Sequence, residues 1–226
     1  MKVIAVIPAY NEAARIGAVL ARVRPLVDEL IVVDDGSADD TFAAVKGEGI
    51  VALRHAINRG QGAALKTGTL AALERGADVV VHLDADGQHD PETISLLVTP
   101  IGRGEADVAF GSRFLGVEAV GMPLSRRALL EAARLFSAFA LGISRSVTDP
   151  QSGFRAMSAK AAKEIDFTQD RMAHCSEILR LVSRSSLRVC EVPTRVRYTS
   201  ETLAKGNKAT DAFHIVWQLF IGAWQK

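Results

Sequence analysis

The order of short apolar runs and helical patterns along the chain is what most restricts its fold. Five runs rich in β-branched residues occur, at residues 3–7, 30–33, 50–53, 79–83 and 108–110. Each is apolar at consecutive positions, which is typical of strands buried on both faces. The first intervening segment has helical period and ends at Pro25; its apolar residues are Ile16, Val19, Leu20 and Val23. The sequence therefore predicts an α/β fold with a mainly parallel sheet flanked by helices.

Length and charge set further limits. The 226 residues, 48% apolar and 23% charged, suit one compact domain. Lysine and arginine number 27 against 26 acidic residues, so a nucleic-acid-binding face is not indicated. Cys175 and Cys190 have neither zinc-binding nor disulfide-framework spacing, which fits a reducing compartment. No signal-like leader occurs, and no apolar run approaches the roughly 18 residues of a spanning helix. We expect a cytoplasmic protein, with peripheral contact at the inner face of a membrane as the alternative.

Polar segments follow the first four predicted strands. In open α/β sheets, ligands bind beyond the carboxyl ends of the strands. The segments there are Pro8-Ala9-Tyr10-Asn11-Glu12, Asp34-Asp35-Gly36-Ser37, Asn58-Arg59-Gly60-Gln61-Gly62 and Asp84-Ala85-Asp86-Gly87-Gln88. Each one alone also fits a helix cap or a turn. Their joint occurrence at one edge predicts a binding site.

Asp84 and Asp86 suggest a metal. Carboxylates at i and i+2 after a strand project to one side, where they can bind a hard divalent cation through oxygen. That cation could hold a diphosphate. An Asp-Gly turn with a solvated acidic neighbour is the alternative interpretation.

The glycines at positions 60 and 62 do not complete a dinucleotide or P-loop motif. Both patterns require a glycine where Leu65 stands, before Lys66. A dehydrogenase or a P-loop kinase is therefore disfavoured. We expect this loop to bring its backbone close to a base or a ribose.

Taken in order, these segments resemble the motifs of family-2 glycosyltransferases, most closely the dolichyl- and polyprenyl-phosphate sugar synthase branch. Gly111-Ser112-Arg113 and Ser152-Gly153-Phe154-Arg155 extend the resemblance to about residue 155. It implies a GT-A fold that binds a GDP- or UDP-sugar with Mg²⁺ or Mn²⁺ and transfers the sugar, usually with inversion. A single catalytic domain over residues 1–226 is expected, with a nucleotide-sugar-binding half at 1–112, an acceptor-side half at 113–209 and a C-terminal helix at 210–226.

The resemblance also implies residue roles. Nucleotide binding falls to Pro8, Tyr10, Asn11, Glu12, Asp35, Asn58, Gly62 and Asp84. Asp35 would accept a hydrogen bond from the base or ribose. The metal ligands would be Asp84, Asp86 and Gln88, with Asp86 essential for catalysis. Phosphate groups would be bound by Arg113, Arg126, Arg127, Lys205 and Lys208, since a guanidinium makes paired, charge-assisted bonds. A solvated helical turn at 126–127 and a plain connector at 205–208 are the alternatives.

The catalytic group depends on the acceptor. A hydroxyl acceptor requires a general base, whereas a phosphate acceptor is already an anion and requires almost none. Asp149 and Glu177 are the candidate bases, and Arg113 is the candidate that reaches phosphate. Glu177 stands at the start of a predicted helix, so a helix-dipole role is its alternative.

Residues 210–226 predict an amphipathic helix whose apolar stripe includes Trp217 and Trp224. Packing on the domain or in a homodimer is favoured over a membrane interface, because few lysines flank it. The lack of a predicted transmembrane tail leaves the acceptor open between a polyprenyl phosphate and a hydroxyl of a glycan or small molecule.

The sequence thus predicts a metal-dependent glycosyltransferase. An enzyme that rearranges or hydrolyses a nucleotide sugar, and a non-catalytic binding module, are alternatives for the same pocket. A nucleotidyltransferase is disfavoured because residues 8–12 lack the expected glycine-rich, basic character.

Overall fold

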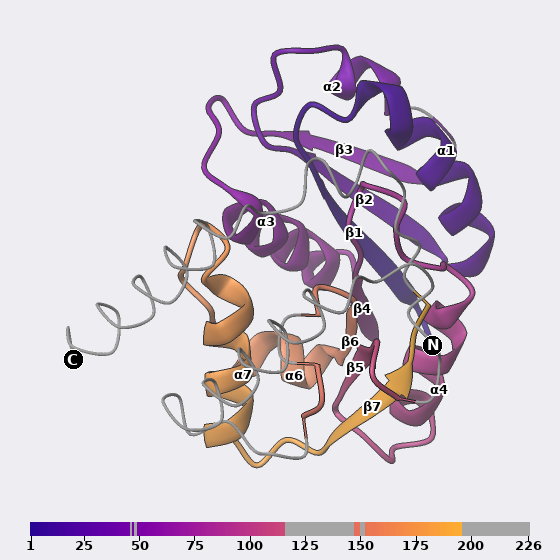
Figure 1. Cartoon of the computed structure of the whole chain (residues 1–226), viewed down its shortest axis with the longest axis vertical. Coiled ribbons are helices and arrows are strands. Elements are labelled where there is room, and N and C mark those ends of the chain that lie inside the picture. The colour runs from indigo at the N-terminus through magenta and orange to yellow at the C-terminus, as the bar shows by residue number, and fades with distance from the viewer. Residues whose placement is uncertain (46, 48, 116–146, 150–151, 196–226) are drawn as a thin grey trace.

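A seven-stranded sheet forms the centre of the protein (Figure 1). The computed structural model describes residues 1–45, 47, 49–115, 147–149 and 152–195. The strand order is β3-β2-β1-β4-β6-β5-β7. The strands are β1 (Val3–Ala9), β2 (Glu29–Asp34), β3 (Ile50–Arg54), β4 (Val79–His82), β5 (Val108–Ser112), β6 (Arg155–Ser158) and β7 (Val189–Pro193). Only β6 is antiparallel to its neighbours, β4 and β5. The five predicted strands are confirmed as β1 to β5, while β6 and β7 were not predicted.

Helices cover both faces of this sheet. They are α1 (Ala13–Val23), α2 (Thr41–Ala44), α3 (Gln61–Glu74), α4 (Thr93–Gly102), α6 (Ala159–Glu164) and α7 (His174–Arg184), with a 3-10 turn η1 (Arg24–Leu26) after α1. The apolar stripe predicted for the first helix is buried. The α-helix stops before Pro25, which lies in η1, because proline cannot donate the next helical hydrogen bond.

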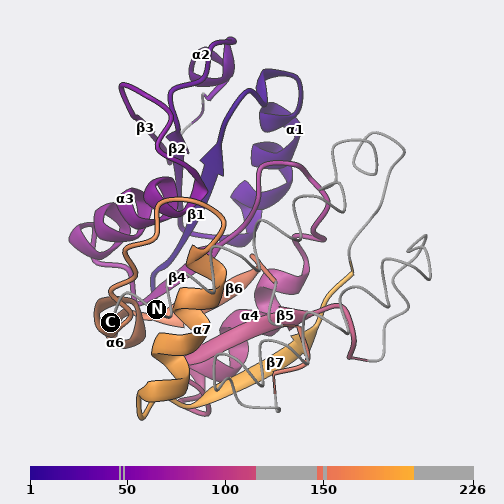
Figure 2. The same ribbon diagram turned by 60° about the vertical axis from the view of Figure 1, so that its left-hand side comes forward.

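Strand β1 shows why the sheet needs two helical layers. Its seven residues are all buried. Alternate side chains of a strand point to opposite faces, so Ala5 and Ile7 pack with α1 and α4, while Ile4 and Val6 pack with α3, α6 and α7. Figure 2 shows the two layers on either side of the strands. The consecutive apolar runs are thus explained by burial on both faces.

Gly68 of α3 allows a close approach between the helix layer and the sheet. A Cβ at this position would lie 2.2 Å from a methyl carbon of Val6 in β1. The helix can therefore pack this closely only because position 68 has no side chain.

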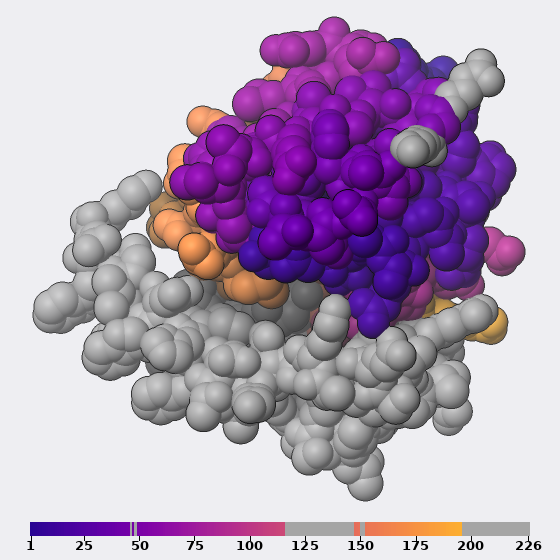
Figure 3. Space-filling view, turned by 90° about the horizontal axis from the view of Figure 1, so that it is seen from above, coloured from indigo at the N-terminus to yellow at the C-terminus, as the bar shows by residue number. Residues whose placement is uncertain are grey.

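The strand register brings the polar loops to one edge. Ala9, Asp34 and Arg54 are paired across β1, β2 and β3, so these three strands end at the same level. Strand β4 is also parallel to β1, and its last residue, His82, pairs with Val6, so its carboxyl end faces the same edge three residues short of this level. Seen from above, the first third of the chain, in indigo to purple, forms one continuous surface (Figure 3).

Within the described residues, no helix combines the length and apolarity required to cross a membrane. Several predictions fall outside the described residues: the phosphate-binding roles of Arg126, Arg127, Lys205 and Lys208, and the helix at 210–226.

Candidate functional site

The loops after β1 and β2 are fixed to each other by hydrogen bonds. Asn11, in the left-handed region with a φ of 54°, donates its backbone N–H to Ser37 Oγ at 2.9 Å. Its side-chain Oδ1 accepts the backbone N–H of Ala38, also at 2.9 Å. The backbone N–H of Glu12 donates to Thr41 Oγ1 at 2.8 Å. Two residues predicted to bind nucleotide thus set the shape of the loop pair.

The other two residues predicted from the first loop differ in accessibility. Pro8 is buried inside β1, and its role in nucleotide binding stays a prediction. Tyr10 is 47% exposed, which leaves an aromatic ring at the rim of this edge. A ring in that position can pack against a flat base.

Asp35 is buried and engages the loop after β3. Its Oδ1 accepts the backbone N–H of Arg59 at 3.0 Å, and its Oδ2 accepts that of Gly60 at 2.6 Å. His55 Nδ1 lies 2.7 Å from Oδ1, and His55 Nε2 lies 2.9 Å from Thr67 Oγ1 of α3. The carboxylate therefore holds the β3–α3 loop in place. Its expected bond to a base or ribose stays a prediction.

The β3–α3 loop also packs tightly against the β2 loop. A Cβ on Gly36, whose φ is +71°, would lie 2.7 Å from the carbonyl carbon of Ile57 and 2.8 Å from the backbone nitrogen of Asn58. Only glycine fits such an approach in this conformation. Asn58, another predicted nucleotide ligand, is therefore held next to the β2 loop.

Glycine is required at positions 60 and 62 because the segment at residues 169–170 packs against them. A Cβ on Gly62 would lie 2.0 Å from the carbonyl oxygen of Gln169, and one on Gly60 would lie 2.5 Å from that of Asp170. The backbone N–H of Ala63 donates to the same Asp170 oxygen at 3.0 Å. A base or a ribose was expected to make this close approach. In the structure the segment before α7 makes the close approach, and contact with a ligand stays a prediction.

Asp84 and Asp86 follow β4 and lie at the same edge. Asp84 Oδ1 accepts a hydrogen bond from Gln61 Nε2 at 2.6 Å, and its Oδ2 lies 3.5 Å from His89 Nε2. Asp86 Oδ1 accepts the backbone N–H of Gln88 at 2.9 Å. The Asp-Gly turn is present, and the metal-binding role of the two carboxylates stays a prediction.

The two carboxylates differ in their acidity. Burial alone would raise the pKa of Asp84, but the hydrogen bond and charge of His89, with the charges of Arg155 and His174, lower it overall. Burial raises the pKa of Asp86, and the charge of Asp84 adds to this effect. The charge of Asp86 is therefore only partly compensated by the Gln88 N–H group and His89.

This donor set fits a divalent cation that is shared with a substrate. Among the described residues, no group of three or more His, Cys, Asp or Glu side chains is arranged to hold a metal. Mg²⁺, however, is commonly bound by one or two carboxylates plus substrate phosphates and water. Asp84 and Asp86 supply such a pair, and the raised pKa of Asp86 is what an added cation would reverse.

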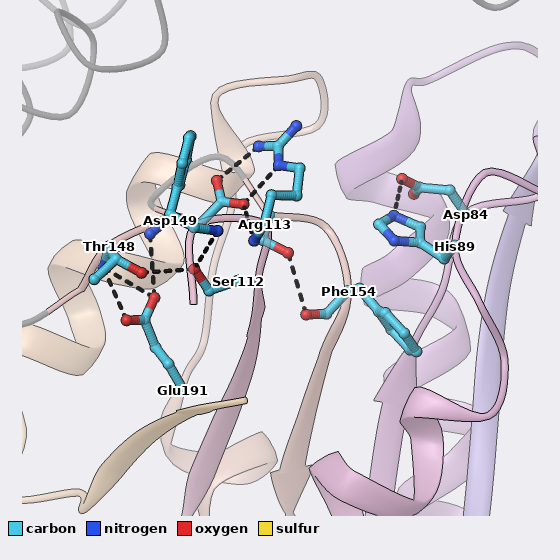
Figure 4. A network of polar contacts seen from close by, with 10 residues as sticks. Asp84, His89, Ser112, Arg113, Thr148, Asp149, Phe154 and Glu191 are labelled. Carbon is cyan, nitrogen blue, oxygen red and sulfur yellow. Dashed lines mark hydrogen bonds and ion pairs between the residues drawn. The ribbon is translucent and has the colours of Figure 1, made fainter. Parts of the chain in front are cut away.

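Arg113 and Asp149 pair with each other (Figure 4). Arg113 Nε and Nη2 donate to Asp149 Oδ2 and Oδ1, each at 2.6 Å. Glu191 of β7 accepts the backbone N–H groups of Thr148 and Asp149 at 2.9 Å and 3.1 Å. The candidate base Asp149 is thus an orienting partner of the candidate phosphate ligand Arg113. Its role as a base stays a prediction.

Arg155, from the Ser-Gly-Phe-Arg motif, is a fully buried cation behind Asp84. Its Nε donates to His82 Nδ1 at 3.3 Å, while His82 Nε2 lies 2.8 Å from Thr69 Oγ1. Because the Thr69 hydroxyl donates to a backbone carbonyl at 2.7 Å, His82 must donate from Nε2 and accept at Nδ1. Burial, with the charge of Arg155, keeps the pKa of His82 well below its usual range, which agrees with this neutral form.

Cys175 lies on the other side of the same guanidinium. Its Sγ is 3.9 Å from Arg155 Nη2 and 3.4 Å from His174 Nε2. Burial opposes ionisation, but the charges of His174 and Arg155 lower the pKa of the Cys175 thiol to about 7. The thiol can therefore share in compensating the buried positive charge.

Glu177 lies in the first turn of α7, as predicted. Its Oε2 accepts the backbone N–H groups of Thr168 and Gln169 at 2.9 Å and 2.8 Å, and its Oε1 accepts the Thr168 hydroxyl at 3.0 Å. These bonds give the carboxylate a structural task. Its role as a base stays a prediction.

Four residues that contact the site were not among the site residues predicted from the sequence: His55, Gln61, His89 and Glu191. Gln61 stood inside a quoted motif, but nothing in the order of residues indicated that it would reach Asp84. Glu191 belongs to β7, a strand that was not predicted. Its position depends on the parallel pairing of β5 with β7, which joins residues about 80 positions apart.

The chain is similar in sequence to proteins of known family. Residues 4–166 match the family model described as "Glycosyl transferase family 2". The UDP-N-acetylglucosamine–dolichyl-phosphate N-acetylglucosaminyltransferase of Methanococcus voltae is 34% identical, over 96% of this chain and 94% of that protein. The undecaprenyl-phosphate mannosyltransferase of Micrococcus luteus is 36% identical, over 74% of this chain and 70% of that protein.

A solved structure has a similar fold. Glucosyl-3-phosphoglycerate synthase from Mycobacterium tuberculosis, in complex with Mn²⁺, UDP-glucose and phosphoglyceric acid, superposes with a TM-score of 0.70. The match covers 98% of this chain and 79% of that one, at 22% sequence identity. The resemblance in fold agrees with the predicted GT-A architecture. With a family match over most of its strands and its motif-bearing loops at one edge, the chain belongs to glycosyl transferase family 2.

Proposed function

We propose that this glycosyltransferase transfers a sugar from a nucleoside diphosphate sugar, a UDP-sugar in the first place, to a polyprenyl phosphate with the help of Mg²⁺ or Mn²⁺. The names of the two relatives support the acceptor, since both proteins act on a polyprenyl-type phosphate. UDP occurs in the name of the first relative and in the complex of the structural neighbour.

The observation that carries the proposal is the pair Asp84 and Asp86 at the end of β4. Burial and the charge of Asp84 raise the pKa of Asp86, so the charge of Asp86 is only partly compensated without a cation. When bound there, a divalent cation would neutralise charge that develops on the diphosphate leaving group. The Asp35-held loop and exposed Tyr10 lie at the same edge, where the nucleoside would bind.

The surroundings of the two candidate bases support a phosphate acceptor. Among the described residues, Asp149 and Glu177 were the acids proposed for this role, and both carboxylates already accept several protein hydrogen bonds. A phosphate oxygen is already an anion, so it can attack the anomeric carbon without a base. The new carbon–oxygen bond forms as the bond to the diphosphate oxygen breaks, with inversion, and a nucleoside diphosphate leaves.

In this scheme Arg113 orients a phosphate group. Asp149 engages its Nε and Nη2, which fixes the plane of the guanidinium. Glu191 in turn fixes the backbone of Asp149. Preorganised charge of this kind is effective because little reorganisation is required during the reaction.

The proposal is tested with the full chain, Mn²⁺, a panel of UDP- and GDP-sugars, and a polyprenyl phosphate in detergent micelles. The expected product is a polyprenyl-phosphate sugar, identified by mass spectrometry, together with one nucleoside diphosphate per transfer. Asp86→Asn should abolish its formation. Conversion of the donor to an isomer or to free sugar, without a lipid product, would favour the rearranging or hydrolysing alternatives. A lack of metal-dependent binding by every nucleotide would overturn the donor site itself.

A further inference from the structure

The segment between α6 and α7 contacts the β3–α3 loop at the candidate nucleotide site. Residues 168–170, here called the strap, are exposed, but they follow the buried side chain of Phe167. Figures 1 and 2 both show this orange loop beside the start of α3. The strap therefore lies between α7 on one side and the glycine-containing loop on the other.

Three hydrogen bonds hold the strap to α7, and all end on one carboxylate. Glu177 accepts the backbone N–H groups of Thr168 and Gln169 and the Thr168 hydroxyl, at distances of 2.8 to 3.0 Å. A carboxylate can only accept, so it suits a position that faces three donors. Alanine in its place would leave these two N–H groups and the hydroxyl without this acceptor.

The strap in turn contacts the loop that Asp35 holds. The carbonyl oxygen of Asp170 would lie 2.5 Å from a Cβ on Gly60, and that of Gln169 would lie 2.0 Å from a Cβ on Gly62. The Asp170 carbonyl also accepts the N–H of Ala63 at 3.0 Å. The N–H groups of Arg59 and Gly60 point to Asp35. The loop is thus held by two partners, the Asp35 carboxylate and the strap.

We propose that Glu177 is a positioning residue of the donor site: by holding the strap, it holds the loop at 59–63, and through that loop the surface that binds the nucleoside. This inference rests on the proposed function. It connects Glu177, which is distant in sequence from the β3–α3 loop, to donor binding. It also predicts that Glu177 acts on nucleotide affinity and not on proton transfer.

The first experiment requires no ligand. Amide hydrogen exchange of the full chain is compared for wild type, Glu177→Ala and Glu164→Ala, the last being a matched change at an exposed acid of α6. We expect exchange of residues 59–63 and 168–170 to accelerate at least fivefold in Glu177→Ala and to stay unchanged in the control. Acceleration confined to α7, or spread evenly over the sheet, would overturn the proposal.

The second experiment measures nucleotide binding by calorimetry with Mn²⁺ and UDP or GDP, whichever the wild type binds. Glu177→Ala should weaken binding about tenfold, equivalent to roughly 1.4 kcal/mol, while kcat at saturating donor falls less than threefold and the pH–rate profile keeps its shape. Loss of kcat with unchanged affinity and a lost limb of the profile would identify Glu177 as the base and overturn the positioning role.

A second variant disturbs the strap from its other side and leaves Glu177 intact. Gly62→Ala places a methyl group against the carbonyl of Gln169 and should reproduce the exchange and affinity changes. If both variants act through the strap, the effects of the double variant will be less than additive. Additive effects would refute a shared path. Should wild type bind neither nucleotide, the proposed function fails, while the exchange experiment still decides the link between Glu177 and the loop.

Discussion

Replacing Asp149 with asparagine tests whether this residue orients Arg113 or removes a proton. Asp149 is 1% exposed and accepts three hydrogen bonds from Arg113, two of them at 2.6 Å from the guanidinium. The Arg113 side chain is 14% exposed, so its charge is not fully screened by water. Asparagine would keep one acceptor and turn an N–H₂ group toward an N–H of Arg113.

The expected loss of stability follows from this geometry. Removing one partner of a buried ion pair costs about 3–5 kcal/mol, because the other charge stays buried. The partial exposure of Arg113 places Asp149→Asn at the lower end, at about 3 kcal/mol. For a chain of this size, that corresponds to a decrease in Tm of roughly 6–12 °C.

The assay is a double-mutant cycle measured by urea unfolding and circular dichroism. The variants are Asp149→Asn, Arg113→Met and the double variant, and we expect a coupling energy of about 2 kcal/mol between the two sites. Glu164→Gln, on an exposed helix position, serves as the control and should leave stability unchanged within about 0.5 kcal/mol. A coupling energy near zero, with full stability of Asp149→Asn and loss of kcat alone, would refute the orienting role and restore Asp149 as a base.

Three further results are expected. Gly68→Ala should destabilise the fold by about 1–3 kcal/mol, because its Cβ would overlap a core methyl group of β1. The matched Gly17→Ala, in a helix with open space around it, should stabilise by up to about 1 kcal/mol, and equal effects in thermal melts would contradict the packing argument. Asp86→Asn should raise the Tm of the metal-free protein at pH 7, because the raised pKa of Asp86 means that its ionisation opposes folding at a pH above the unfolded pKa. The same variant should lose the Mn²⁺-dependent stabilisation by UDP. A lower Tm, or retained stabilisation by UDP, would speak against the metal site. Arg188 lowers the pKa of Asp107 to about 2, so the stability from this pair is complete above the unfolded pKa and is lost as pH falls from about 4 to 2. Asp107→Asn should flatten this part of the acid-unfolding curve, and an unchanged curve would exclude the contribution.

The parallel part of the sheet could be predicted from the chain because its signals are local. Five consecutive apolar runs and the periodic stripe of α1 report burial directly, and each lies within a few residues. The strands β6 and β7 gave weaker signals. Strand β6 contains the fully buried Arg155, and β7 is partly exposed at the sheet edge, so neither has a continuous apolar run.

The sequence by itself also predicted that the polar loops lie at one edge of the sheet. Parallel strands end at the same edge, so the loops after β1 to β4 lie along it whatever the strand order. Motif order then indicated the family, which the match over residues 4–166 confirmed. The roles of Asp84 and Asp86 in binding a metal stay predictions that the surroundings of both carboxylates support.

Only the tertiary structure decided which polar groups satisfy one another. Asp149 and Glu177 looked alike in sequence, as acids near motifs, yet one accepts hydrogen bonds from Arg113 and the other from the strap. Likewise, the glycines at 60 and 62 make room for a carbonyl-bearing segment that lies more than a hundred residues later. Such partners are set by the packing of α7 and β7 against the first half. A buried acid takes its function from the donors that the fold places around it, and no local pattern of residues records where those donors will lie.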